Sequence, residues 1–216
     1  MSWRVGLIPG SRSLVLGLAL LGLAGCGHAP PVPETQYHQL SRPESLAQPG
    51  KPLLQLPVRV DNLVSDDLRQ DRAWVYSAAP PHLSLQESHL HYWVDTPGRL
   101  LQAYLRDFLV AQGIVASAML SDAASEGYWV KGEILRLERE LEPDGEFVHV
   151  ELELRLGQVG AERALVHGRF ADRRAVGTGV EPGVGPAVLA FSEAVSQVCL
   201  QFVQAIRTQA DKLAAH

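Results

Sequence analysis

Residues 147–156 read Phe-Val-His-Val-Glu-Leu-Glu-Leu-Arg-Leu, and this stretch decides the fold. Every second side chain in it is aliphatic, and these are Val148, Val150, Leu152, Leu154 and Leu156. The side chains between them are aromatic, polar or charged, and these are Phe147, His149, Glu151, Glu153 and Arg155. Because successive side chains of a strand point to opposite faces, the alternation predicts a β-strand with one buried face and one solvated face.

The segments on either side of this strand extend it into a β-meander. Upstream, residues 128–141 are predicted to be the other arm of a hairpin, because Pro143-Asp144-Gly145 has the composition of a tight turn. Downstream, residues 163–176 are predicted to form a third strand. Consecutive strands joined by short turns pair antiparallel, so we expect an antiparallel three-stranded unit.

Two amphipathic helices are predicted outside the meander. The first begins at Thr96-Pro97, since proline is favoured at the first helical position, and Gly113 is placed to end it. Its apolar stripe contains Leu100, Leu101, Tyr104, Leu105, Phe108 and Leu109. The second begins at Ala187, and its apolar side chains are Val188, Phe191, Val195, Val198, Phe202, Ile206 and Leu213. Stripes of this width are typical of helices that pack on a core.

Shorter elements complete the fold prediction. Four short strands are expected, at residues 37–40, 53–60, 73–77 and 83–85. Pro57 would place the second of them at an edge or a bulge. Residues 61–70 are predicted to be a polar turn or a one-turn helix, and residues 177–186 a loop. We therefore predict that residues 36–213 form a single α+β domain, with a mainly antiparallel (mixed) sheet that contains a β-meander and is covered by two amphipathic helices.

The N-terminal sequence predicts an export signal followed by a lipid anchor. Residues 1–13 contain Arg4 and Arg12 but no acidic residue, and an apolar run follows from Leu14 to Leu23. The run is too short to cross a bilayer, which takes about 20 residues, so residues 1–25 are predicted to be a signal peptide. Leu23-Ala24-Gly25-Cys26 resembles the bacterial lipobox. That resemblance implies cleavage before Cys26 and its acylation with diacylglycerol and an N-acyl (palmitate-type) chain.

The anchor predicts where the protein resides. Each buried methylene contributes about 0.8 kcal/mol, so three acyl chains should hold the protein on a membrane almost permanently. Residues 26–35 contain three prolines and are predicted to be an extended tether. Position 27 is Gly, whereas an Asp there commonly retains bacterial lipoproteins at the inner membrane. We therefore expect the periplasmic face of the outer membrane rather than the inner membrane.

Composition excludes some classes of function. The 216 residues include 24 acidic and 19 basic side chains, for a formal net charge of −5. A nucleic-acid-binding protein needs a clustered basic face, so no nucleic-acid partner is expected. If Cys26 is acylated, Cys199 has no partner within the chain. Its apolar helical surroundings predict a buried free thiol.

Candidate metal and catalytic groups are few. His89 and His91 would share one face of an extended segment, a spacing that metal sites use, with His82 in sequence reach. Exposed histidines on a loop or an edge strand are the favoured interpretation, so we predict no metal site and no cofactor other than the acyl chains. Glu151 and Glu153 would need a pocket that raises a pKa to work as acid and base. They are expected to be solvated, as is the strand edge Glu138-Arg139-Glu140.

No Gly-x-Ser-x-Gly or His-Glu-x-x-His motif occurs in the sequence, so no catalytic residues and no enzymatic activity are predicted. Tyr92 and Trp93 precede the first long helix and have two interpretations. Core packing is favoured. Alternatively they anchor a protein partner, since Tyr and Trp are enriched at interface hot spots.

The order of these features resembles the ABC-type transport auxiliary lipoprotein component family, over about residues 36–207. The resemblance rests on the lipobox, Tyr37 to Leu40, the Leu-rich strand 53–60, Leu68 to Tyr76, Tyr92-Trp93, the meander and the closing helix Ala190-Phe191-Ser192-Glu193-Ala194-Val195. Val94-Asp95-Thr96-Pro97 departs from the shorter, more acidic junction that members often show.

The resemblance implies a non-enzymatic periplasmic lipoprotein that works with an ABC permease, its ATPase and a protein with a mammalian-cell-entry (MCE) domain. Such systems move phospholipids or other hydrophobic molecules across the cell envelope. Only Cys26 carries over as a functional position, and a homo-oligomer is left open. The alternative is a stand-alone lipoprotein that binds a lipid between its sheet and its helices.

Overall fold

The computed structural model describes residues 33–42, 51–78, 80–120, 126–177 and 184–214. The chain divides into two compact units, Met1–Glu34 and Thr35–His216. All the helices and strands described below belong to the second unit. The predicted signal peptide, the lipidated Cys26 and most of the tether lie outside the described residues.

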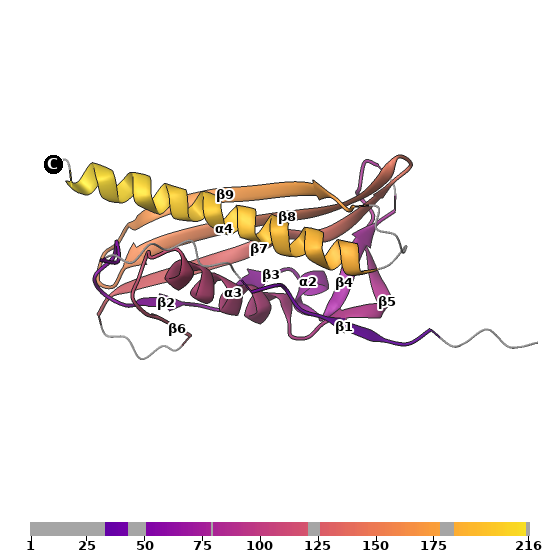
Figure 1. Cartoon of the computed structure of the whole chain (residues 1–216), viewed down its shortest axis with the longest axis horizontal. Helices are drawn as coiled ribbons and strands as arrows, with labels where there is room; N and C mark the ends of the chain where they lie inside the picture. Colours follow the sequence, from indigo (N-terminus) through magenta and orange to yellow (C-terminus); the bar gives the residue numbers. More distant parts are fainter. Residues whose placement is uncertain (1–32, 43–50, 79, 121–125, 178–183, 215–216) are drawn as a thin grey trace, which may run out of the picture. The chain divides into compact units, whose positions relative to one another are not determined.

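Three long antiparallel strands form the predicted meander (Figure 1). They are β7 (Tyr128–Glu142), β8 (Gly145–Gln158) and β9 (Ala164–Ala175). In register, Val150 of β8 lies opposite Leu137 of β7 and Asp172 of β9. The two residues between β7 and β8, Pro143 and Asp144, make the turn. The meander and its turn are therefore confirmed.

Six shorter strands join the sheet: β1 (Gln36–His38), β2 (Val58–Val60), β3 (Val64–Ser65), β4 (Ala73–Ser77), β5 (Gln86–Trp93) and β6 (Ala118–Met119). Strands β2, β3 and β4 each pair parallel with β7, β1 pairs parallel with β5, and β6 pairs parallel with β2. Five of the eight strand pairs among the described residues are therefore parallel. The sheet is mixed as predicted. The expectation that most pairings would be antiparallel is wrong, because the short strands that precede β7 return to it through crossovers.

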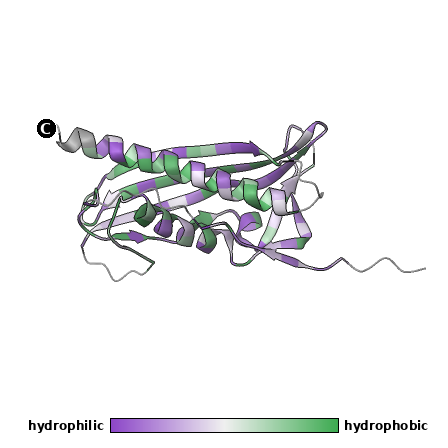
Figure 2. Ribbon diagram, viewed as in Figure 1, coloured by the Kyte–Doolittle hydropathy of each residue, from purple (hydrophilic) through white to green (hydrophobic). Residues whose placement is uncertain are grey.

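The helices are α2 (Asp67–Gln70), α3 (Pro97–Ala111) and α4 (Val184–Ala214). Helix α4 contacts β8 and β9, and α3 contacts β2, β6 and α4. Figure 1 shows both long helices in front of the sheet, and Figure 2 shows the green apolar residues along them. Residues Val184–Ala210 are long and apolar enough to span a membrane, but 56% of that apolar window is buried inside the domain. Helix α4 thus packs as a core helix.

The core lies between β8 and the two helices. The five alternating aliphatic side chains of β8 are each at most 2% exposed, which confirms the predicted buried face. Helix α4 faces them with Phe191, Val195, Val198, Phe202 and Ile206, all buried. Cys199 is a buried free thiol, as predicted, and burial raises its pKa, so the thiol stays protonated.

Three predicted boundaries are wrong. The strand expected at 53–60 is reduced to β2, because the backbone N–H groups of Leu53 and Leu54 donate to carbonyls of Gly113 and Ile114 beyond α3. No strand forms at 83–85; β5 begins at Gln86. Helix α4 begins at Val184, three residues before the predicted start, so the loop expected at 177–186 is shorter and its middle lies outside the described residues.

Candidate functional site

The second set of β8 side chains, Phe147, His149, Glu151, Glu153 and Arg155, defines the outer face of the meander. Glu138 and Glu140 of β7 lie opposite His149 and Phe147 in register, and directly paired residues share a face of the sheet. Ser77, the last residue of β4, lies opposite Glu140 in the parallel pair of β4 and β7. The segment that follows β4 is thereby brought to the end of the outer face where β7 turns.

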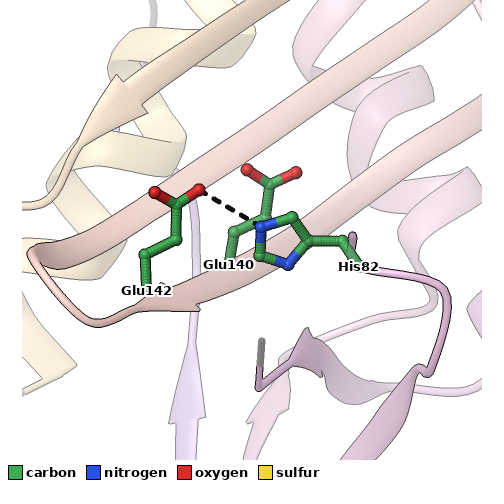
Figure 3. Close-up of side chains that lie close together, drawn as sticks. All are labelled: His82, Glu140 and Glu142. Atoms are coloured by element: carbon green, nitrogen blue, oxygen red, sulfur yellow. Dashed lines mark hydrogen bonds and ion pairs between the residues drawn. The ribbon is translucent and has the colours of Figure 1, made fainter. Parts of the chain in front are cut away.

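His82 in that segment meets Glu140 and Glu142 of β7, and Figure 3 shows the three side chains converging. The imidazole Nε2 lies 3.2 Å from Oε1 of Glu142. The other ring nitrogen, Nδ1, lies 2.7 Å from the hydroxyl of Ser77, which is fully buried. One potential ligand atom from each of His82, Glu140 and Glu142 lies within 4.8 Å of the others. We call these three residues the His82 cluster.

Glu140 is 3% exposed and is held by two strands of the outer face. Its carboxylate accepts hydrogen bonds from Nδ1 of His149 at 3.0 Å and from Nε of Arg173 at 2.5 Å. Burial by itself would raise the pKa of Glu140, but the hydrogen bonds and charges of Arg173 and His149 outweigh it and lower the pKa. Arg173 also donates to Glu142, so one guanidinium joins both carboxylates of the cluster.

Glu138 extends the buried polar region toward α2. Its side chain is 2% exposed and forms an ion pair with Arg69, itself 7% exposed, and with Arg136 at 3.1 Å. Arg69 is held on its other side by Asp66, the residue that caps α2. The expectation that Glu138 and Glu140 are a solvated strand edge is therefore wrong. Arg69 of α2 pairs with Glu138 and Arg173 of β9 pairs with Glu140, and both cations are distant in the sequence. Arg136 of β7 lies only two residues before Glu138.

The nitrogen and oxygen atoms of the His82 cluster could hold a cation. An imidazole nitrogen with two carboxylates is a donor set that zinc and other divalent transition metals accept. Among the described residues, this is the one group of three such donors that lie within reach of each other.

The histidines proposed from spacing do not form this site. His89 is exposed, and neither it nor His91 belongs to a group of three donors among the described residues. His91 instead meets His38 of β1, with His38 Nε2 3.3 Å from His91 Nδ1. Burial is the main cause that lowers the pKa of each. For His38 the next causes are His91 and then Arg139, and for His91 the next cause is Arg139. The pair thus connects β1 to β5 as two neutral rings.

Tyr92 and Trp93 lie in different environments. Trp93 is 1% exposed and packs with Trp74 and Phe191, at ring-centroid distances of 4.9 and 5.2 Å. Tyr92 is half-buried and faces Tyr37 of β1 at 5.9 Å. Of the two side chains, Tyr92 is the one that a partner can reach without disturbing the core.

A second cluster on the outer face is centred on Glu153. Arg155, His167 and Arg169 bond to its carboxylate and lower its pKa to about 2. A carboxylate with so low a pKa stays ionised, so it does not serve as a general acid. Glu151, on the same face, pairs with Arg136 at 3.6 Å.

The helix side of the domain has an open groove of about 440 Å³ between α3 and α4. Tyr104 and Phe108 form part of its apolar floor, and Leu189 and Leu200 stand on its rim. Most of its other lining is polar: Ser41, Arg42, Gln112, Arg174, Ser192, Glu193, Ser196 and Gln197. The groove is continuous with the segment after β1, because the backbone N–H of Ser41 donates to the hydroxyl of Ser192 at 3.0 Å.

Comparisons with known proteins show a shared fold. No family model and no curated protein matches the sequence. Protein XCC0632 from Xanthomonas campestris, a DUF330 protein, superposes with a TM-score of 0.68 at 15% identity, over 84% of this chain and 100% of that one. An uncharacterised protein gives a TM-score of 0.62 at 13% identity, over 80% and 99%. PelC from Paraburkholderia phytofirmans, a dodecamer, reaches 0.40 at 14% identity, over 69% and 90%. The chain is thus structurally similar to a DUF330 protein.

Proposed function

We propose that this protein is a lipid-anchored, non-enzymatic accessory component of an ABC-type transporter with an MCE-domain partner, which moves phospholipids or other hydrophobic molecules across the envelope. The observation that carries the proposal is the short distance along the chain from the lipobox to the domain. Cys26 is the lipobox cysteine, and β1 begins at Gln36. At about 3.3–3.6 Å per residue, this tether keeps β1 within about 35 Å of the bilayer.

The outer-membrane location belongs to the same proposal, because it rests on Gly27 following the lipobox cysteine. A domain held this close to a membrane meets partners at that membrane at high local concentration. Modest contact surfaces therefore suffice for association. Tyr92 is a half-buried aromatic side chain, and the rim of the groove between α3 and α4 supplies the exposed aliphatic side chains Leu189 and Leu200. Interfaces use side chains of both kinds.

The alternative, a lipoprotein that itself carries a lipid, has less support. Ligand sites for apolar molecules are mostly apolar concavities that bury the ligand. The groove between the helices is open, and eight of its twelve lining residues are polar. The space between β8 and α4 is filled by side chains that are at most 2% exposed. We therefore place partner docking ahead of lipid carriage.

The test is co-purification from native membranes. The full-length protein with a C-terminal tag is expressed in its own host, solubilised in mild detergent and captured, and the bound proteins are identified by mass spectrometry. Enrichment of an MCE-domain protein with a permease and an ATPase is expected. Cys26→Ser is the matched control, because it leaves the domain unchanged and removes the anchor, so the same partners should be depleted.

The same preparation distinguishes the alternatives. Full recovery of the membrane-anchored protein without any MCE-domain protein or transporter subunit contradicts the accessory role. Native mass spectrometry that finds one lipid bound to the domain, beyond the acyl chains on Cys26, favours lipid carriage instead. Cys26→Ser that stays in the membrane fraction contradicts the lipid anchor on which both functions depend.

A further inference from the structure

Carboxylates outnumber guanidinium groups in the ion-pair network around the His82 cluster. Ion pairs connect it into one network with five carboxylates, those of Asp66, Glu138, Glu140, Glu142 and Glu151. The same ion pairs bring in three guanidinium groups, those of Arg69, Arg136 and Arg173. Among the described residues, the five carboxylates of this network outnumber its three guanidinium groups by two. A surplus of carboxylates in a partly buried network favours a further cation, because water screens their mutual repulsion poorly.

We propose that His82, Glu140 and Glu142 bind one divalent transition-metal ion, with Zn²⁺ as the best match. The ion adds positive charge at the end of the network where the donor atoms converge (Figure 3). Zinc takes imidazole nitrogen and carboxylate oxygen at about 2.0–2.2 Å. The 3.2 Å between Nε2 of His82 and Oε1 of Glu142 suits two ligands of one tetrahedral ion. Mg²⁺ and Ca²⁺ prefer all-oxygen sites, so the imidazole selects against them.

The imidazole is already oriented for this role. Metal-binding histidines usually bond through their second ring nitrogen to a neighbouring group, which fixes the ring and the tautomer. Here Nδ1 of His82 lies 2.7 Å from the buried hydroxyl of Ser77. When Nδ1 donates its proton to that hydroxyl, the Nε2 lone pair faces Glu142. Ser77 is therefore a positioning residue for the site.

Arg173 is the group that competes with the metal. Its guanidinium bonds to both carboxylates of the cluster, and a divalent ion must share or displace it. The guanidinium has a second partner in the ring of Phe147, whose centroid lies 3.8 Å from Cζ of Arg173. A cation over an aromatic face is stabilised by the ring quadrupole, so Arg173 keeps a favourable position when the ion takes Glu142. In the metal-free protein, Arg173 therefore holds the two carboxylates in place. In the metal-bound protein, the ion holds them.

The experiment is a calorimetric titration of the purified full-length protein in detergent with ZnCl₂, after treatment with a chelator. We expect one saturable site, with no matching heat from MgCl₂. His82→Ala and Glu142→Gln should abolish that site. Ser77→Ala should weaken it by about 10-fold, the usual effect of losing the partner of a metal-binding histidine. Arg173→Gln should strengthen it, because the competing cation is removed.

The matched control is His167→Ala, which removes a histidine bonded to Glu153 on the same outer face but outside the His82 cluster. It should bind zinc as the wild type does. Circular dichroism and the thermal midpoint establish that each variant is folded. In the wild type, saturating zinc should raise that midpoint, and in folded Glu142→Gln it should not. Absence of a saturable zinc site in the wild-type protein overturns the proposal, and so does equal zinc affinity in folded His82→Ala.

Discussion

The two faces of strand β8 are stabilised in different ways. On the inner face, aliphatic side chains pack against α4, and what they require is volume and shape. On the outer face, the alternating residues join ion-pair networks with β7 and β9, and what they require is a partner of opposite charge. The two faces of one strand therefore have different roles. The inner face stabilises the fold by apolar packing. The ion pairs of the outer face can rearrange around a ligand without disturbing the core.

The largest loss of stability is expected when side-chain volume is removed from the inner face. Phe191→Ala deletes a ring that is 1% exposed and contacts both Trp74 and Trp93. We expect the free energy of unfolding to fall by about 3–5 kcal/mol, measured by denaturant titration. Leu189→Ala is the control on the same helix, because Leu189 is 59% exposed. Its effect should stay within about 0.5 kcal/mol, and equal losses in both variants would contradict the assigned core.

The most deeply buried ion pair of the outer face joins Glu138 to Arg69, and removing one partner should destabilise the protein. Glu138→Leu leaves the buried guanidinium of Arg69 without its ion-pair partner on β7. Removing one member of a buried pair should lower the free energy of unfolding by about 3 kcal/mol. The double variant Glu138→Leu/Arg69→Met should recover most of that loss, because no deeply buried charge is left without a partner. Asp66 is 57% exposed, and Arg136 keeps Glu140 and Glu151 as partners. A double variant as unstable as the single one would show that the pair itself contributes net stability.

The histidine pair between β1 and β5 gives a smaller, pH-dependent effect. The folded-state pKa values of His38 and His91 are lowered by burial and by Arg139. Above about pH 6.5 both rings are neutral in the folded and the unfolded states. As pH falls below that value, the unfolded chain takes up protons that the folded one resists, so stability decreases until pH passes below the folded-state pKa values. The free energy of unfolding, measured by denaturant titration at several pH values from 8 to 5, reports this decrease.

The control for that titration is a double variant, His38→Gln/His91→Gln, which removes both rings and keeps a polar side chain at each position. Its stability should decrease less between pH 7 and pH 5 than that of the wild type. An identical slope in the wild type and in this double variant would assign the acid sensitivity to other groups.

The smallest effect is expected at the Glu153 cluster, which is exposed. Arg169→Ala removes one of the three cations bonded to this carboxylate, so the pKa of Glu153 should rise from about 2 toward its ordinary value. Carboxyl resonances followed by NMR across an acid titration report this directly. Water and salt screen such pairs, so global stability should hardly change. An unchanged pKa would mean that Arg155 and His167 alone hold the carboxylate.

Sequence patterns predicted the inner half of this structure better than the outer half. The alternation in β8 and the stripes of α3 and α4 follow from periods of two and of three to four residues, which are local properties. The buried pair of Glu138 and Arg69 and the His82 cluster were not predicted. His82 and Glu142 are 60 residues apart in the chain, and they meet because β4 pairs parallel with β7. The one local hint was the presence of acidic residues at alternate positions, 138, 140 and 142, in a strand that also has a buried face.

By itself, the sequence determined the strand order of the meander, the positions of the two long helices, the burial of Cys199 and the expectation of a lipid anchor at Cys26. Each depends on neighbours a few residues away: side-chain period, turn composition or a short motif. Only the tertiary structure decided which short strands run parallel to β7, that Trp93 is buried while Tyr92 faces Tyr37, and that Glu138 and Glu140 are covered. Those outcomes depend on contacts between distant segments, and an acidic side chain is solvated or buried according to whether a distant cation reaches it.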